Sequence, residues 1–314
     1  MSKARLTLAL ITLIVTTIIW AVPATGAAHR RAQHTSDTAL GTRLTIPGAI
    51  RFREVRDRGL LVDAWINGSG PYTFAIDTGA GDSIITPGVV SRARLPVRLG
   101  SRTFQGGLTG SAIVSNQEAT IQELALGNYG NLLPTRLIAA VADGLPAGVD
   151  GILDPTEAFS PLGYSIDLPH HDLQAFDSRA QPLRLTDTPV DGTVVRWIRE
   201  QGSDRPFVRL GDGRLALLDT GSGFGLAVNE ATVGGLEKVK QRHVSDLGGG
   251  RVQSRRVAPV TVSIGAMVLR SVPTDVLSGV LADTPTILGR GALYPFRITF
   301  DPTSRLIAIE PSEN

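Results

Sequence analysis

Short apolar stretches, broken every few residues by Gly, Pro, Asn or Asp, run along the chain from Leu44 onward. Val62–Ile66 alternates apolar and polar side chains, as a half-buried strand does. Asn67-Gly68 is typical of a tight hairpin turn, and Tyr72–Ile76 predicts a second strand that leads into Asp77. Long apolar runs with a helical period are scarce. The pattern therefore predicts an all-β protein made of many short strands.

The strand that leads into Asp77 has a counterpart later in the chain. Phe74–Ile76 runs into Asp77-Thr-Gly-Ala, and Leu215–Leu218 runs into Asp219-Thr-Gly-Ser, 142 residues later (219 − 77). A second pair of similar segments follows at an offset of 134 (301 − 167): Asp150–Leu153 with Tyr164–Asp167, and Thr286–Gly289 with Arg297–Asp301. Similar segments in the same order and at nearly equal offsets predict a duplicated β unit.

Composition narrows the possible chemistry. The 314 residues are 42% hydrophobic, which is enough for a substantial core, and they include no Cys. This excludes disulfides, a Cys nucleophile and thiolate metal sites. The five His residues show no zinc-binding spacing, and His170-His171 is interpreted as a solvated turn, so we expect no metal and no cofactor. The formal charge of +2, without a Lys/Arg block, gives nucleic-acid binding little electrostatic support.

The N-terminus predicts export from the cytoplasm. Lys3 and Arg5 precede the apolar run Leu6–Val22, and small residues follow Pro23. Residues 1–27 are therefore interpreted as a signal peptide, with an uncleaved membrane anchor as the alternative. Residues 28–43 are expected to be a flexible leader. Either reading makes the protein extracytoplasmic, that is secreted, periplasmic or attached to a membrane through its N-terminal segment.

Two Asp-Thr-Gly segments at the ends of strands indicate a particular chemistry. Gly79 and Gly221 would allow a partner to approach closely. If the two loops face each other, Asp77 and Asp219 lie within a few ångströms and share one proton, because two close carboxylates do not both ionise readily. One carboxylate then accepts a proton from water while the other donates to a substrate carbonyl, so no covalent intermediate is needed.

These segments resemble a known family. Ile66–Ala80 resembles the active-site strand and loop of retropepsin-like aspartic proteases, and Leu217–Ser222 is similar to the pepsin version. Ile287-Leu288-Gly289 followed by Phe296–Asp301 is similar to the closing segment of both. The resemblance spans roughly residues 53–311.

The resemblance implies an all-β, bilobal fold with internal duplication, like that of pepsin and retropepsins. We expect an N-terminal lobe over residues 44–187 that carries Asp77 and a C-terminal lobe over residues 188–314 that carries Asp219. The two Asp residues match the catalytic pair. The next three residues of each loop match positions that support the catalytic pair: Thr78, Gly79 and Ala80 in the first, and Thr220, Gly221 and Ser222 in the second. The resemblance implies that the two threonines lock the loops together.

Family members cover bound peptide with a β-hairpin flap. Phe104–Val114 and Val244–Val252 occupy equivalent places in the two halves and are rich in Gly. They are therefore candidate flaps, with plain hairpin loops as the alternative. The residues expected at their tips are Gly106, Gly107, Leu108, Thr109 and Gly110 in the first, and Gly248, Gly249 and Gly250 in the second.

Several positions depart from the family pattern. Asp154 stands where the family has Gly, and its side chain is expected to crowd the loop that bears Asp77. Ala80 occupies the place of Ser222 and lacks a hydroxyl that would stabilise an ionised Asp. We therefore expect a working pH less acid than that of pepsin. Arg251, Arg255 and Arg256 are interpreted as one solvated strand face.

The predicted function is that of an aspartic endopeptidase, whose partners are peptides or unfolded protein segments. A catalytically inactive peptide-binding or assembly module of the same fold is the alternative. A metal- or serine-dependent hydrolase is a third possibility, which the residue inventory disfavours.

Overall fold

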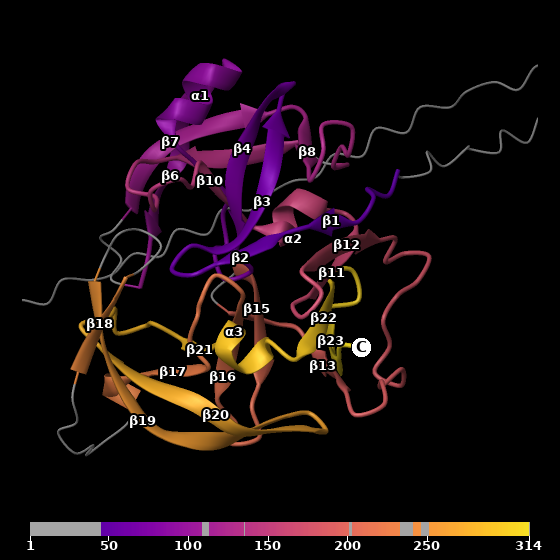
Figure 1. Cartoon of the computed structure of the whole chain (residues 1–314), viewed down its shortest axis with the longest axis vertical. Helices are drawn as coiled ribbons and strands as arrows, with labels where there is room; N and C mark the ends of the chain where they lie inside the picture. Colours follow the sequence, from indigo (N-terminus) through magenta and orange to yellow (C-terminus); the bar gives the residue numbers. More distant parts are fainter. Residues whose placement is uncertain are drawn as a thin grey trace, which may run out of the picture. The chain divides into compact units, whose positions relative to one another are not determined.

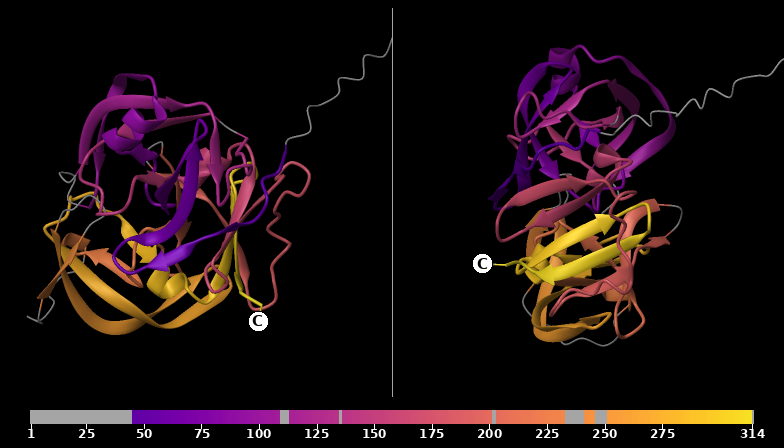
Figure 2. Two further views of the ribbon diagram at one scale, coloured as in Figure 1. Left: turned by 45° about the horizontal axis from the view of Figure 1, so that its top comes forward. Right: turned by 90° about the vertical axis from the view of Figure 1, so that its right-hand side faces the viewer.

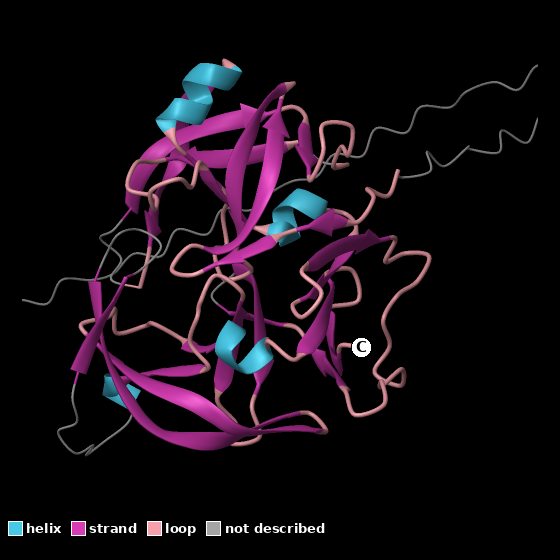
Figure 3. Ribbon diagram, viewed as in Figure 1, coloured by secondary structure: helices cyan, strands magenta, loops and turns pink. Residues whose placement is uncertain are grey.

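Strands dominate the computed structural model, and its few helices are short (Figure 3). The structure describes residues 45–108, 113–134, 136–200, 203–232, 241–245 and 251–313. The predicted signal segment and leader, residues 1–43, lie outside this part. No helix in the described ranges is long and apolar enough to cross a membrane.

Within these ranges the strands form three sheets. The nine-stranded sheet runs in the order β2 (Arg53–Val55), β3 (Gly59–Ile66), β4 (Ser69–Ile76), β10 (Gly151–Leu153), β5 (Ile84–Ile85), β9 (Leu137–Val141), β7 (Ile113–Ile121), β6 (Val97–Gly106), with β8 (Leu124–Leu126) paired to β3. The eight-stranded sheet runs β14 (Ile198–Glu200), β15 (Ser203–Arg209), β16 (Leu215–Asp219), β21 (Thr286–Gly289), β17 (Leu226–Asn229), β20 (Met267–Ser278), β19 (Arg251–Ile264), β18 (Gln241–Ser245). The six-stranded sheet runs β1 (Ile50–Arg51), β12 (Asp172–Phe176), β11 (Gly163–Asp167), β22 (Phe296–Asp301), β23 (Leu306–Pro311), β13 (Thr193–Arg196).

The two larger sheets repeat one topology, which confirms the all-β fold with internal duplication. In the first, β4 pairs with β10 in parallel, β10 with β5 antiparallel, and β5 with β9 in parallel. In the second, β16, β21, β17 and β20 follow each other with the same three orientations. The predicted hairpin is confirmed too. Strands β3 and β4 pair antiparallel, and Asn67 and Gly68 join them with the positive φ angles of such a turn.

The six-stranded sheet draws equally on both halves of the chain. Its order is palindromic, because β11 and β12 follow β10 just as β22 and β23 follow β21. The central pair, β11 and β22, is antiparallel and brings Ile166 opposite Ile298. Figures 1 and 2 show the yellow C-terminal strands beside the strands of the first half. The two halves therefore share one sheet.

Aromatic side chains fill the core beside this shared sheet. Tyr164 from β11 stacks on Phe300 from β22, with ring centroids 4.8 Å apart, and both are fully buried. Trp197 packs edge-on against Phe300 at 5.9 Å. Each large apolar side chain buried here contributes roughly 1.5–3 kcal/mol of hydrophobic stabilisation. The core therefore helps to hold the two repeats together.

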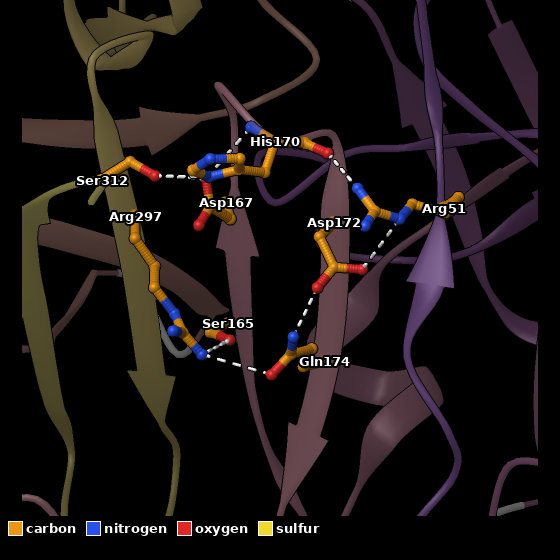
Figure 4. Close-up of polar contacts among 8 residues, drawn as sticks. All are labelled: Arg51, Ser165, Asp167, His170, Asp172, Gln174, Arg297 and Ser312. Carbon is orange, nitrogen blue, oxygen red and sulfur yellow. Dashed lines mark hydrogen bonds and ion pairs between the residues drawn. The ribbon is translucent and has the colours of Figure 1, made fainter. Parts of the chain in front are cut away.

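Polar contacts tie the same strands together (Figure 4). Arg297 on β22 donates to Ser165 on β11 at 3.2 Å and to Gln174 on β12 at 3.3 Å. His170, in the turn after β11, lies 3.1 Å from Asp167 and 2.8 Å from the Ser312 hydroxyl. Burial opposes ionisation of Asp167, but hydrogen bonds from Ser312 and His170 outweigh it and lower the pKa of this carboxyl.

The described part of the chain also contains three short α-helices and one 3₁₀ turn: α1 (Pro87–Ala93), α2 (Pro155–Phe159), α3 (Arg290–Leu293) and η1 (Glu230–Thr232). Both α1 and α2 begin at Pro after a capping residue. The side chains of Thr86 and Asp154 accept hydrogen bonds from the first helical turn. Helix α2 follows β10 as α3 follows β21, so the repeat extends to these helices.

Candidate active site

The two Asp-Thr-Gly loops hold each other through buried hydrogen bonds. The hydroxyl of Thr78 donates to the Leu218 carbonyl at 2.7 Å and accepts from the Thr220 N–H at 3.0 Å. In the opposite direction, the Thr220 hydroxyl accepts from the Thr78 N–H at 3.1 Å and lies 3.4 Å from the Ile76 carbonyl. Both threonines are fully buried. The repeated loops therefore meet face to face.

This arrangement brings the carboxyl groups of Asp77 and Asp219 together. The two side chains share a hydrogen bond. Each carboxylate also accepts from its own loop, Asp77 from the Gly79 N–H at 2.8 Å and Asp219 from the Ser222 N–H at 2.9 Å. Each lies over the other loop's glycine, so that a Cβ on Gly79 would stand 2.7 Å from the Asp219 Cγ.

Burial and mutual repulsion raise the pKa of this pair. Burial is the largest cause for Asp77, and the negative charge of Asp219 adds to it, so the Asp77 pKa lies well above its ordinary value. Burial raises the pKa of Asp219 as well, but the hydrogen bond from Asp77, the Ser222 N–H and the positive charge of Arg290 oppose this rise. These causes favour Asp77 over Asp219 as the carboxyl group that carries the shared proton.

Arg290 is a buried cation behind the second loop. It begins helix α3 directly after Gly289 and is 7% exposed. Its Nε donates to the Glu54 carboxylate at 3.1 Å, and Nη1 donates to the Thr220 carbonyl. Our sequence reasoning did not single out this residue. The available signal was its position immediately after Ile287-Leu288-Gly289.

Asp154 does not crowd the loop that bears Asp77. Its side chain turns to the start of helix α2 and accepts from the Thr156 N–H at 2.8 Å, while its own N–H donates to the Ser83 hydroxyl at 3.1 Å. Gly289, its counterpart, has no such room, because a Cβ there would lie 2.7 Å from the Ser222 carbonyl oxygen. Burial and the charge of Glu157 raise the pKa of Asp154 to about 7.

A cavity of about 1060 Å³ opens over the carboxyl pair. Apolar side chains form two of its walls, Ile84, Ile113 and Ile152 from the first repeat and Phe224, Val252 and Ile287 from the second. Within the described ranges, no group of three or more His, Asp or Glu is arranged to hold a metal ion.

Hairpins β6–β7 and β18–β19 stand where the two flaps were expected. Their strands pair up to Gly106↔Ile113 and Ser245↔Arg251. Gly107 and Leu108 line the cavity, and the Leu108 carbonyl accepts from the Leu281 N–H at 3.2 Å. The remaining tip residues, Thr109, Gly110, Gly248, Gly249 and Gly250, lie outside the described residues.

The predicted solvated face of arginines on β19 is wrong for Arg255. This side chain is 7% exposed and lies 3.6 Å from the Glu230 carboxylate. Arg256 lines the cavity and pairs with the buried carboxylate of Asp275 at 2.9 Å. Successive side chains of a strand point to opposite faces of the sheet, so Arg255 and Arg256 cannot share one solvated face.

Comparison with known proteins bears on the first repeat. Residues 62–154 match the model of a protein family described as aspartyl protease. The match supports an aspartyl protease family. It contains Asp77 with its loop and ends at Asp154, whereas Asp219 lies beyond it. None of the curated proteins compared with the chain matches it.

The structure brings together most residues predicted from the two motifs. Thr78 and Thr220 link the loops, and Gly79 and Gly221 provide the close approach. Ala80 and Ser222 occupy equivalent places in the two loops. The Ser222 hydroxyl accepts a hydrogen bond from the Phe224 N–H at 3.3 Å, and it is the backbone N–H of Ser222 that donates to the Asp219 carboxylate. Their roles in a reaction stay predictions.

Proposed function

We propose that this protein is an aspartic endopeptidase of the two-lobed, pepsin- and retropepsin-like kind. The observation that carries the proposal is the hydrogen-bonded pair of carboxyl groups, one from each repeat: Asp77, which is buried, and Asp219, which is half-buried. The family match over residues 62–154 supports the same assignment. In this proposal the lobes are residues 44–187 and 188–314, and the cleft lies between them.

The chemistry follows from one proton shared by two carboxyl groups. Ionised Asp219 accepts a proton from a water molecule held between the pair, and the resulting hydroxide attacks the peptide carbonyl carbon. Protonated Asp77 donates to the carbonyl oxygen, which gives a tetrahedral diol. Asp219 then passes its proton to the amide nitrogen, and one diol hydroxyl returns a proton to Asp77 as the C–N bond breaks. The products are a carboxylic acid and an amine, and the pair again holds one proton on Asp77. The protein needs no covalent intermediate and no cofactor for these steps.

The cavity suits an extended peptide with apolar residues beside the bond that is cut. Each repeat contributes apolar side chains to the cavity that the carboxyl pair lines, Ile84, Ile113 and Ile152 from the first and Phe224, Val252 and Ile287 from the second. Hairpins β6–β7 and β18–β19 border the cavity and would act as flaps that bind the substrate backbone.

The raised pKa of Asp77 favours activity above the strongly acid range. The reaction needs the pair with one proton, and this state persists up to the higher of the pair's two pKa values. Burial, Asp219 and the nearby charge of Asp154 all raise the pKa of Asp77. A pH–rate profile with its optimum only in pepsin's strongly acid range would contradict this expectation.

Substitution of each carboxyl group tests the proposal. Asp77→Asn and Asp219→Asn should each abolish cleavage of an unfolded protein substrate and of peptide libraries, while thermal unfolding stays cooperative. Asp187→Asn, in an exposed loop, is the matched control and should keep full activity. A pepstatin-type inhibitor should block turnover. Activity that survives both substitutions, or that a chelator or a serine-directed reagent removes, would point to another hydrolase class.

An inactive peptide-binding or assembly module is the competing function. It would bind peptides with micromolar or tighter affinity and cut none of them at any pH, whereas the endopeptidase turns them over. The proposed setting is extracytoplasmic, with residues 1–27 as signal peptide or anchor. Detection of the N-terminus of the exported protein by mass spectrometry distinguishes these two forms.

A further inference from the structure

Several arginines lie around the carboxyl pair. Among the described residues, five arginines line the cavity: Arg56, Arg58, Arg205, Arg256 and Arg290. Two have carboxylate partners, since Arg290 pairs with Glu54 at 3.1 Å and Arg256 with Asp275 at 2.9 Å. These two are electrostatically neutralised by the protein itself. The other three are therefore the candidates for binding an external anion.

Arg56 and Arg58 are weak candidates. Both are exposed on the turn between β2 and β3, and Asp57 lies between them in the chain. Interactions of exposed charges are screened by water and salt, so these two side chains contribute little selectivity.

Arg205 differs because it is half-buried and held in place. Its Nε donates to the Ser203 hydroxyl at 3.1 Å, and its guanidinium lies 5.4 Å from the centre of the Phe207 ring. The Trp197 indole N–H donates to its backbone carbonyl at 3.0 Å. Among the residues that the structure describes, no carboxylate lies within ion-pair distance of it. The two terminal nitrogens are thus free to donate to a ligand.

Arg205 also stands beside the loop of Asp77. Its side-chain Cγ and Cδ lie 3.2 Å from the place where Gly81 would carry a Cβ, and Gly81 follows the Asp-Thr-Gly-Ala segment. A preorganised cation at this distance would meet a substrate side chain one or two residues from the bond that is cut.

On the opposite side of the pair, the described residues include no comparable half-buried free cation. Strand register makes Gly59 the counterpart of Arg205, because Leu61 pairs with Ala75 as Phe207 pairs with Leu217. The space at Gly59 is taken by Arg290, whose Nη1 lies 3.7 Å from the position of a Cβ there, and Glu54 neutralises that arginine. The charge of the cleft is therefore asymmetric about the carboxyl pair.

We propose that the cleft selects peptides with an Asp or Glu side chain on the Arg205 side of the cut bond, where the guanidinium binds the carboxylate. This inference rests on the proposed peptide-cleaving function and adds a substrate class to it. Apolar residues beside the bond and one acidic residue farther along on one side together define the preferred sequence.

Kinetics on a peptide series tests the proposal. One peptide with apolar residues around the cut bond receives a single Glu at each position in turn, with Gln and Lys versions for comparison. At one position, kcat/KM should be about tenfold higher with Glu than with Gln, as expected for a hydrogen bond to a charged group, and lower still with Lys. Equal rates for Glu and Gln at every position would overturn the proposal.

Variants assign the preference to Arg205. Arg205→Gln should remove the advantage of Glu at that position, and Arg205→Lys should keep part of it. Arg209→Gln is the matched control, because Arg209 lies exposed on the same strand outside the cavity and should leave the preference unchanged. A preference that survives Arg205→Gln in the folded variant would refute the assignment.

Peptide binding to the Asp219→Asn variant tests this inference separately from the proposed function on which it rests. Fluorescence anisotropy with labelled Glu and Gln peptides measures selectivity without turnover. If the wild-type protein cuts no peptide but the variant binds Glu peptide in an Arg205-dependent way, only proteolysis fails. Cleavage without charge preference refutes only the inference. If peptides are neither cut nor bound, both proposals fail.

Discussion

Replacement of Thr78 by Val should destabilise the protein far more than a change of one atom suggests. The two side chains have nearly the same shape, but Val lacks the hydroxyl that joins the repeated loops. That hydroxyl donates to the Leu218 carbonyl at 2.7 Å and accepts from the Thr220 N–H at 3.0 Å, in a fully buried place. The substitution leaves one carbonyl and one N–H buried without partners.

The structure gives a magnitude for this loss. Each buried polar group left without its hydrogen bond costs roughly 1–3 kcal/mol, so two of them lower the free energy of unfolding by roughly 2–6 kcal/mol. Domains are typically stable by about 5–15 kcal/mol, so the effect is large. Thr220→Val should cost less, because one of the contacts of that hydroxyl is longer, at 3.4 Å.

Urea unfolding, followed by tryptophan fluorescence, measures these differences at equilibrium. Thr78→Ser keeps the hydroxyl and is the matched control, with an expected loss below about 1.5 kcal/mol for the deleted methyl group. The folded Thr78→Val protein should also cut peptides more slowly, because the loops no longer hold the two carboxyl groups in place. A Thr78→Val protein whose free energy of unfolding lies within about 1 kcal/mol of the wild-type value would refute the reasoning. So would a larger loss for Thr220→Val.

Three further substitutions probe the surroundings of the carboxyl pair. Gly221→Ala should lower kcat/KM by about a hundredfold or more, because a Cβ there overlaps the Asp77 carboxylate, whereas Gly88→Ala in helix α1 should be harmless. Asp154→Asn should flatten the dependence of stability on pH. Burial raises the pKa of this carboxyl to about 7 in the folded protein, so its contribution is fully present below pH 3.8 and is lost as pH rises through 7. Urea unfolding measures this effect. Between pH 4 and pH 8 the free energy of unfolding should fall by about 4 kcal/mol more in the wild type than in the variant. Arg290→Gln should lower the free energy of unfolding by about 2–3 kcal/mol and shift the acid limb of the pH–rate profile upward, because its positive charge lowers the pKa of Asp219.

Each of these three has an outcome that contradicts it. A Gly221→Ala enzyme with wild-type kcat/KM would mean that the carboxyl pair does not lie against that glycine during turnover. Parallel stability curves for the wild type and Asp154→Asn would mean that Asp154 does not titrate in this range. An unchanged acid limb in Arg290→Gln would show that the arginine acts on stability alone.

Features encoded in adjacent residues were predictable from the sequence. The hairpin at Asn67-Gly68 has turn residues between two strand-like segments, and the duplication is visible as the repeated Asp-Thr-Gly segments at Asp77 and Asp219. Both signals are local, so no knowledge of packing was needed. That the two loops face each other was inferred from the same segments and their resemblance to a family.

Burial of charged side chains was not predictable in the same way. Arg255 looked solvated because only the tertiary structure brings its partner, Glu230, close to it. Arg290 finds Glu54 across 236 residues of sequence. The pattern of residues along a chain does not reveal such partners, because the two charged side chains come close only after distant segments have folded together. The capping role of Asp154 was missed for a different reason. Asp followed by Pro is typical of the start of a helix, but the sequence analysis considered this residue only as a replacement for the family's Gly.

The palindromic sheet formed by β11, β12, β22 and β23 has a consequence for any half of this chain produced alone. Cutting between the repeats would strip the central strand, β11 or β22, of its neighbour and leave a row of unpaired N–H and C=O groups. The geometry of that open edge matches a second copy of the same half. An isolated repeat should therefore assemble into a symmetric homodimer, with one Asp-Thr-Gly loop supplied by each copy.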